Sequence, residues 1–391
     1  MSHSKKFDVV VYGATGFTGR LVAEYLARQY AGDGSLKWAM AGRSADKLAQ
    51  VRDEIGASKD TPLVIADAGD LSSLQAMVAS TKVVLTTVGP YQLYGSDLVE
   101  LCAKSGTDYV DLCGEPVWMS YMIEAHEKAA QQSGARIVFS CGFDSIPFDL
   151  GVYHLQQLAK QQLGAMVPRV KGRVRKMKGT FSGGTAASLK ATLASARNNP
   201  DEMQRLMNHF SLTPGFQGPE QPHGNKPYFD EDLGTWVTSF IMAAINTRNV
   251  HRSNALLGHA YGEDFVYDEM MVTGPGDKGE AIANAVAKDK GMMAEGGPKP
   301  GEGPSKEERE AGYYDVLFYG IGKDGRRIQV SVSGDLDPGY GSTCKMIAES
   351  AICLAKDATE TKGGIWTTAP AMGEQLIKRL SENAGLVFKQ E

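Results

Sequence analysis

Seven residues near the N-terminus, Gly13 to Gly19, constrain the fold of this chain more than any other stretch. Their sequence, GATGFTG, directly follows the apolar run 7–12 and opens a helical pattern of apolar side chains at positions 17, 21, 22, 25 and 26. This order of strand, glycine turn and helix start is the one that a dinucleotide-binding βαβ unit requires. We therefore expect a Rossmann-type, doubly wound parallel sheet of the α/β class, with a phosphate site at the first helix N-terminus.

The three glycines of this loop have different predicted roles. Gly13 permits the tight turn, Gly16 leaves no Cβ between the helix and a pyrophosphate, and Gly19 lets helix and strand pack closely. The spacing alone is a weak signal, because glycine makes up 45 of the 391 residues. Its place between a strand and a helix favours nucleotide binding over an ordinary tight turn. The loop residues predicted to contact the cofactor are Gly13, Thr15, Gly16, Phe17, Thr18 and Gly19.

The end of the second predicted strand, residues 36–41, indicates which dinucleotide is bound. An NAD-binding domain usually places an acidic residue here, on the ribose 2′-hydroxyl. This chain instead has Arg43 and Ser44, a guanidinium and a hydroxyl that suit a 2′-phosphate. The alternative is that Ser44 only caps the next helix and Arg43 is solvated. With the glycine loop upstream, we favour NADP(H) as the cofactor.

Further strand patterns alternate with helices up to residue 147 and complete the first predicted domain. They lie at 62–67, 82–88, 108–112 and 136–140. In an open parallel sheet the cofactor passes the carboxyl ends of the strands, so residues just after them are candidates for contact. Those predicted to contact it are Asp67, Val88, Gly89 and Pro90. Asp67 could equally well form a turn.

After residue 147 the pattern changes and predicts a second, α+β domain with a mixed or antiparallel sheet. A basic strand at 170–181 and a strand at 265–273 flank a predicted amphipathic helix at 236–257. A hairpin of strands 313–321 and 326–333 follows. The predicted division is a dinucleotide-binding domain of residues 1–147, a substrate or dimerisation domain of residues 148–339, and C-terminal helices in residues 340–391 that return to the first domain.

Bulk composition excludes several classes of function. A net charge of −5 gives no electrostatic footprint for nucleic acid. No apolar run approaches the roughly 18 residues of a membrane-spanning helix, and the N-terminus has no apolar signal region. The five cysteines include no C-x-x-C pair, which argues against a disulfide framework or a zinc site. We expect a cytoplasmic protein with no bound metal and no nucleic-acid partner.

Reduction by a nicotinamide needs a hydrogen-bond donor at the acceptor and a proton source. The carboxyl edge of the first sheet supplies Tyr91, Glu115 and Asp144, and the facing domain supplies Tyr340. Structural roles compete with these catalytic ones. Glu115 and Asp144 would cap the helices that begin near residues 116 and 147, and Tyr91 would pack over the cofactor. A short-chain dehydrogenase mechanism is excluded, because the single Tyr-x-x-x-Lys spacing falls in the hairpin turn at 319–323.

Eight motifs resemble the saccharopine dehydrogenase-like oxidoreductases, in particular the trans-acting enoyl reductases and the lipid-droplet-associated members. They are residues 13–19, 41–44, 87–91, 111–115, 142–147, 182–185, 300–304 and 337–341, and they span essentially the whole chain. The resemblance implies a Rossmann domain, a second domain with a mixed sheet, and a C-terminal segment packed against the first domain. It also implies NADPH-dependent reduction of a double bond in a polyketide-derived lipid. Cys113 stands where Ser or Thr is expected, and no catalytic residue can be transferred.

Three functions remain open at this point. The first is an NADP(H)-dependent oxidoreductase that reduces the C=C bond of an apolar acyl substrate. The apolar face of residues 236–257 would form a wall of its pocket, although such a face more often belongs to the core. The second is a saccharopine-type amino-acid imine reductase, whose acidic substrate would need the basic residues of 169–178; a solvated strand face explains those more simply. The third is a catalytically silent nucleotide-binding protein at a lipid surface. Each could form a homodimer.

Overall fold

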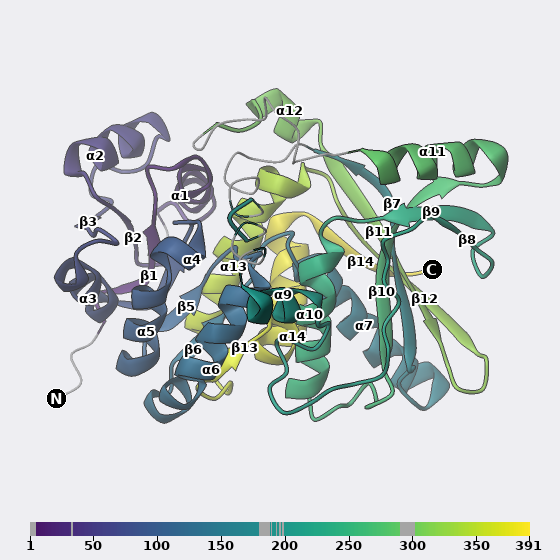
Figure 1. Ribbon diagram of the computed structural model, residues 1–391. Coiled ribbons are helices and arrows are strands. Elements are labelled where there is room, and N and C mark those ends of the chain that lie inside the picture. The colour runs from purple at the N-terminus through teal and green to yellow at the C-terminus, as the bar shows by residue number, and fades with distance from the viewer. Residues whose placement is uncertain are drawn as a thin grey trace.

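The computed structural model describes residues 5–32, 34–179, 188, 190–192, 194, 197, 199–289 and 302–391. Within these residues the chain forms two seven-stranded sheets with helices between them, seen at the left and right of Figure 1. Sheet A is parallel throughout, and sheet B is mixed. The predicted α/β class with a second mixed sheet is therefore confirmed. Among the described residues, no helix combines the length and apolar composition needed to cross a bilayer.

Sheet A has the strand order β13-β6-β5-β4-β1-β2-β3. Its strands are β1 Phe7–Tyr12, β2 Trp38–Gly42, β3 Leu63–Ile65, β4 Thr81–Thr86, β5 Asp108–Val110, β6 Arg136–Val138 and β13 Gly364–Trp366. The crossover helices are α1 Phe17–Gln29, α2 Ala45–Glu54, α3 Leu71–Ser80, α4 Tyr91–Tyr94, α5 Ser96–Ser105 and α6 Pro116–Ser133. The order reverses direction at β1, which creates the crevice where such sheets bind ligands.

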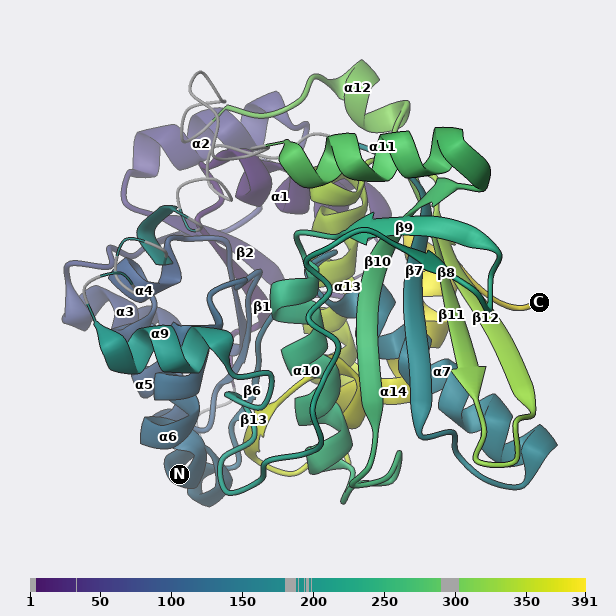
Figure 2. The ribbon, with the colours of Figure 1, turned by 45° about the vertical axis from the view of Figure 1, so that its right-hand side comes forward.

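Sheet B has the order β14-β12-β11-β7-β10-β9-β8. Its strands are β7 Arg169–Lys178, β8 Tyr228–Asp230, β9 Thr235–Ser239, β10 Val266–Gly274, β11 Tyr313–Ile321, β12 Arg327–Gly334 and β14 Leu386–Gln390. Strands β7 and β10 pair in parallel, whereas β11 and β12 form the predicted hairpin. Figure 2 shows the central strands β10, β7 and β11 standing side by side. The other helices of this half are α7 Ile146–Leu163, α9 Pro200–Met207, α10 Ala243–Leu256, α11 Gly276–Lys288 and α12 Lys306–Glu310.

The helix predicted over residues 236–257 is wrong in its first part. Residues Thr235–Ser239 form strand β9, which pairs antiparallel with β10, and helix α10 begins only at Ala243. The β-branched side chains of Thr235, Val237 and Thr238 favour a strand. Strand β9 also pairs with β8, and both partner strands lie outside residues 236–257, so the apolar periodicity within that range did not reveal the strand.

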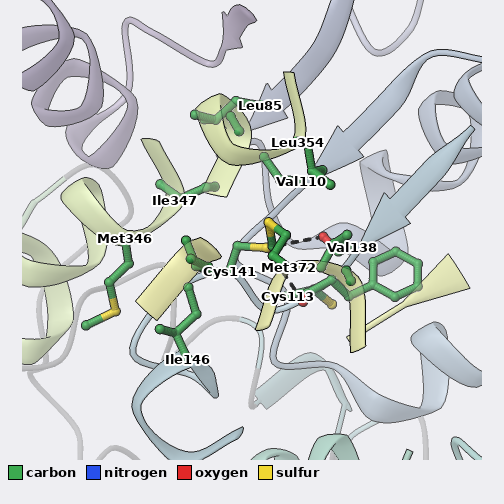
Figure 3. Packing of buried hydrophobic residues seen from close by; sticks show 14 of the residues in the cluster. Leu85, Val110, Cys113, Val138, Cys141, Ile146, Met346, Ile347, Leu354 and Met372 are labelled. Atoms are coloured by element: carbon green, nitrogen blue, oxygen red, sulfur yellow. Dashed lines mark hydrogen bonds between the residues drawn. The ribbon is translucent and has the colours of Figure 1, made fainter. Parts of the chain in front are cut away.

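The C-terminal region connects the two sheets. Helix α13, Thr343–Lys356, packs on β1, β4 and β5, and helix α14, Thr368–Arg379, contacts both α13 and α7. Figure 3 shows Ile347 and Leu354 of α13 gathered with core side chains of the strands of sheet A. Strand β13 then extends sheet A, whereas β14 is the last strand of sheet B. The segment thus contributes to both sheets, and the division into domains at 147 and 339 stays a prediction.

Candidate cofactor and catalytic site

The glycine loop between β1 and α1 has the geometry of a phosphate cradle. Gly13 has a φ of +91°, which favours glycine, and a Cβ on Gly19 would lie 2.1 Å from the Gly13 carbonyl oxygen. Gly16 is the N-cap of α1, and no side chain caps this helix. The first turn of α1 is therefore open toward an anion, with the helix dipole favouring negative charge. This observation fits the pyrophosphate of a dinucleotide.

A cavity of about 900 Å³ opens in front of this loop and lies between the two halves of the chain. Most of the predicted cofactor residues line it, namely Gly13, Thr15, Gly16, Phe17, Thr18, Arg43, Asp67, Val88 and Gly89. Gly19, Ser44 and Pro90 do not. Gly19 instead allows the close approach of α1 to the loop, so its role lies in backbone packing.

Arg43 and Ser44 follow strand β2, and Asp67 follows β3; of the three, Arg43 and Asp67 line the cavity. The Ser44 hydroxyl accepts a hydrogen bond from the backbone N–H of Lys47 at 3.3 Å and so caps α2. Arg43 is exposed, and in the described part of the chain no carboxylate pairs with it. Asp67 accepts a bond from the Gly69 N–H at 2.9 Å and also lines the cavity, so its turn-forming role and a cofactor contact are compatible.

The carboxylate of Glu115 and the hydroxyl of Tyr91 form hydrogen bonds with other groups of the protein. The buried Glu115 carboxylate accepts hydrogen bonds from the backbone N–H groups of Tyr91 at 3.0 Å and Gln92 at 2.8 Å, and from the Ser188 hydroxyl at 2.8 Å. It does not line the cavity, and it holds α4 rather than capping α6. The Tyr91 hydroxyl donates to the Thr86 carbonyl and accepts from the Leu112 N–H at 3.1 Å.

Asp144 follows strand β6 and faces the cavity. It does not cap α7, whose N-cap is Ser145. Oδ2 of Asp144 lies over Gly114, where a Cβ would be 3.4 Å away. Burial raises the pKa of the Asp144 carboxyl to about 7. Such a group is half protonated near neutral pH, as a general acid should be.

Tyr340 lies across the cavity in the short helical turn Pro338–Ser342. Its ring packs edge-on against Phe17 of the glycine loop, with centroids 4.9 Å apart. The carboxylate of Asp337 accepts hydrogen bonds from the backbone N–H groups of Tyr340 and Gly341, so Asp337 has a structural role. Burial raises the pKa of the Tyr340 hydroxyl, with the charges of Asp337 and Asp144 adding to the effect.

The far wall of the cavity is apolar, and most of it was not predicted from the sequence. Its apolar members are Leu93, Tyr94, Met177, Leu206, Ile241, Met242, Ala244 and Ile245. Leu93, Tyr94 and Ile241 are exposed, at 64%, 49% and 42% of their surface, which is unusual for side chains of this kind. The predicted apolar face of residues 236–257 does contribute, through Ile241, Ala244 and Ile245, whereas Trp236 lies on β9 against Phe229.

The basic residues of β7 do not reach the cavity. Arg169 pairs with Asp268, Lys171 with Asp230 and Asp232, and Arg175 with Asp315 and Glu391. Arg173 is completely buried and pairs with both Asp230 and Asp268. The interpretation of a solvated strand face is therefore wrong for Arg173. These side chains neutralise carboxylates of sheet B, and they offer no site for a substrate with several carboxylates. The motifs at 182–185 and 300–301 lie outside the described residues.

Comparison with known proteins identifies the family. Residues 9–138 match the model of the saccharopine dehydrogenase NADP binding domain. A provisionally named trans-acting enoyl reductase of Mycobacterium tuberculosis is 42% identical over 404 residues, which cover 96% of each chain. The trans-acting enoyl reductase of Mycobacterium ulcerans is 36% identical over 415 residues, covering 99% of this chain and 98% of that one.

Solved structures share the fold at much lower identity. Saccharopine dehydrogenase (L-Glu forming) from Saccharomyces cerevisiae superposes with a TM-score of 0.57 at 11% identity, over 98% of this chain and 99% of that one. Homospermidine synthase from Legionella pneumophila gives a TM-score of 0.54 at 9% identity, over 99% and 92%. The full-length relatives, the matched domain and the shared fold agree with the motifs. The chain belongs to the saccharopine dehydrogenase-like oxidoreductases, in the branch of the trans-acting enoyl reductases, and is an enzyme that binds a nicotinamide cofactor.

Proposed function

We propose that the protein uses NADPH to reduce the carbon–carbon double bond of an apolar 2-enoyl substrate. The observation that carries the proposal is one cavity of about 900 Å³, which is lined by residues that follow several strands of sheet A. It runs from Arg43 after β2, past the glycine loop, to Asp144 after β6, and there meets the apolar wall. One end suits a phosphorylated dinucleotide and the other an acyl chain. The relatives named enoyl reductases support the same reaction.

The polarity of the two ends sets the direction in which the ligands would lie. The uncapped α1 N-terminus and Arg43 favour the phosphates of NADP(H) on the β1–β2 side. The nicotinamide would then lie near Val88 and Gly89 after β4, next to the apolar wall. A saccharopine-type imine substrate is disfavoured, because four cationic side chains of β7, those of Arg169, Lys171, Arg173 and Arg175, are paired with carboxylates of the protein and do not line the cavity.

The experiment is turnover by the purified protein. NADPH oxidation is followed in the presence of 2-enoyl thioesters of increasing chain length, with the saturated thioesters as blanks and a keto acid plus amino acid pair as the competing substrate class. We expect oxidation with the enoyl compounds, faster for longer chains, and formation of the saturated product by mass spectrometry. Tight NADPH binding without turnover of any substrate would instead identify a catalytically silent nucleotide-binding protein, and turnover of the imine pair alone would identify an imine reductase.

A further inference from the structure

Two polar groups facing the cavity have no partner within the part of the chain that the structure describes. The half-buried Asp144 carboxylate accepts no hydrogen bond and joins no ion pair there, and the Tyr340 hydroxyl is buried without a partner. Buried polar groups in folded proteins are almost always hydrogen-bonded. The buried Tyr340 hydroxyl therefore lacks a hydrogen bond that a ligand in the cavity would supply, and the Asp144 carboxylate beside the same cavity is free to bind that ligand.

Two fully buried carboxylates of the same region are satisfied by the protein. Asp111, after β5, accepts hydrogen bonds from one hydroxyl and two backbone N–H groups. Asp149, on α7, accepts from two hydroxyls and one backbone N–H. Both therefore have structural roles that account for their burial. Asp144 differs from them because its carboxylate is turned to the cavity and left for a ligand.

The two groups come from opposite halves of the chain and differ in acidity. Asp144 lies between β6 and α7, whereas Tyr340 precedes α13. Burial brings the pKa of Asp144 to about 7, so the neutral acid is present at physiological pH. Burial drives the pKa of Tyr340 upward, so its hydroxyl keeps its proton and serves as a hydrogen-bond donor. The pair thus offers one proton that can be transferred and one that stays.

On the basis of the proposed function, we propose that Asp144 is the general acid that protonates the substrate carbon α to the carbonyl, while the Tyr340 hydroxyl binds the carbonyl oxygen. Tyr91 and Glu115 are unsuited to these tasks. The Tyr91 hydroxyl is already engaged with two backbone groups, and the Glu115 carboxylate holds α4 and lies outside the cavity.

The reaction needs only NADPH, Asp144, Tyr340 and water besides the substrate. NADPH, when bound, supplies the hydride that adds to the β carbon. The π electron pair of the C=C bond moves toward the carbonyl, and the Tyr340 hydroxyl stabilises the negative oxygen that results. The O–H bond of Asp144 then breaks as the C–H bond at the α carbon forms. The Asp144 carboxylate regains its proton from water, so one NADPH and one proton are consumed for each double bond reduced.

The test compares the wild type with Asp144→Asn, which keeps the shape and removes the acid. We expect kcat to fall about 10²–10³-fold, with the NADPH dissociation constant and the substrate KM within about twofold of the wild type. Asp144→Glu should recover part of the lost kcat. Asp97→Asn, on the exposed surface of α5, serves as the matched control and should keep the wild-type rate.

The protonation of Asp144 gives two further readouts, the pH dependence of kcat and an infrared signal that does not depend on turnover. Because the acid must carry its proton, wild-type kcat should decline as pH rises through about 7, and this limb should be missing in Asp144→Asn. The charge of Asp144 acts on two other titratable groups, the Tyr340 hydroxyl and the Cys113 thiol. Burial raises the pKa of both groups, so they stay neutral in this pH range. Infrared difference spectra should show a protonated carboxyl signal at pH 6 that Asp144→Asn lacks.

Each outcome decides between the two proposals. An active wild type with an Asp144→Asn variant within threefold of its kcat overturns the role of Asp144 and leaves the proposed function standing. A missing carboxyl signal at pH 6 also overturns that role. A wild type that binds NADPH but reduces no enoyl compound removes the proposed function, and the role of Asp144 falls with it.

Discussion

The ring of Tyr340 packs edge-on against the ring of Phe17, with an interplanar angle of 87°. Phe17 belongs to the glycine loop and Tyr340 to the segment before α13, so this contact joins the cofactor loop to the C-terminal region of the chain. The guanidinium of Arg309 lies over the Phe17 ring, 5.7 Å from the ring centroid. Packing of the two rings holds the Tyr340 hydroxyl in place without a hydrogen bond to it.

Tyr340→Phe removes the hydroxyl and keeps the ring that packs against Phe17, so it tests the hydroxyl by itself. We expect kcat to fall about 10²-fold, as for loss of one oxyanion donor. The melting temperature should not fall, because the hydroxyl has no partner among the described residues. Steady-state kinetics and thermal unfolding check the two expectations. Tyr313→Phe removes the hydroxyl of an exposed tyrosine on β11 and should change neither. A loss of stability in Tyr340→Phe with unchanged kcat would contradict the role given to the hydroxyl.

Arg43→Asp tests the cofactor preference. The substitution replaces a cation at the β2 end of the cavity with an anion, so it should repel a 2′-phosphate. We expect the dissociation constant for NADPH to rise about 10–100-fold, the equivalent of about 1.5–3 kcal/mol for a charged hydrogen bond. The constant for NADH should change little. Arg28→Asp, an exposed position on α1 outside the cavity, is the matched control for the change of charge. Equal losses for both cofactors would refute a 2′-phosphate contact.

Ile241→Asp tests the apolar wall. Each methylene of an acyl chain that enters the pocket contributes about 0.8 kcal/mol, or roughly fourfold in kcat/KM. In the wild type we expect kcat/KM to rise with chain length, and in Ile241→Asp this dependence should flatten while the shortest substrate is least affected. Ile282→Asp is well matched, since Ile282 is 41% exposed on α11 and Ile241 is 42% exposed. A parallel loss at every chain length would show that Ile241 does not contact the acyl chain.

Glu269 of β10 should make the stability of the protein depend on pH. Its buried carboxyl accepts hydrogen bonds from Asn246 and Tyr267, and burial raises its pKa from 4.5 to about 8. Because the folded pKa lies above the unfolded one, the stabilisation is complete below about pH 4.5 and is lost as pH rises through about 8. Each pKa unit corresponds to about 1.4 kcal/mol, so the effect amounts to a few kcal/mol.

Glu269→Gln should remove this contribution. Between pH 5 and pH 8, the free energy of unfolding of the wild type should fall relative to that of the variant, as measured by urea denaturation at each pH. The difference between the two proteins is the quantity to compare, because burial also raises the pKa of Asp111 to about 7 and of Asp149 to about 6. A difference that stays constant over this range would refute the assignment to Glu269.

Local patterns were sufficient to predict six of the seven strands of sheet A, the glycine cradle and the β11–β12 hairpin. In each case strand, turn and helix signals lie within a few residues of one another, as in the run from Phe7 to Gly19. The residues at the carboxyl ends of the strands followed from the topology, because parallel strands all end at one edge. Asp144 and Arg43 were predicted on that ground.

Long-range pairings could not be predicted in the same way. Strand β13 has only three residues, and its partner β6 lies more than 200 positions earlier. The alternation of basic residues in β7 resembled a solvated face, but the carboxylates that bury Arg173 come from β8 and β10. The apolar wall likewise combines side chains from α4, α9 and the start of α10. No local sequence pattern predicts that these elements come together in the fold.

The placement of β13 and β14 has a consequence for how the chain acquires its structure. Residues 364–366 supply an edge strand of sheet A, and residues 386–390 supply an edge strand of sheet B. Neither sheet can therefore gain all of its strands until nearly all of the described chain has been synthesised. Contacts of such large sequence separation slow folding, because a long loop must be closed before they form. Until then, the exposed edges of β6 and β12 are open to wrong pairing. The nascent protein is therefore expected to depend on protection from aggregation during translation, and to tolerate premature termination poorly.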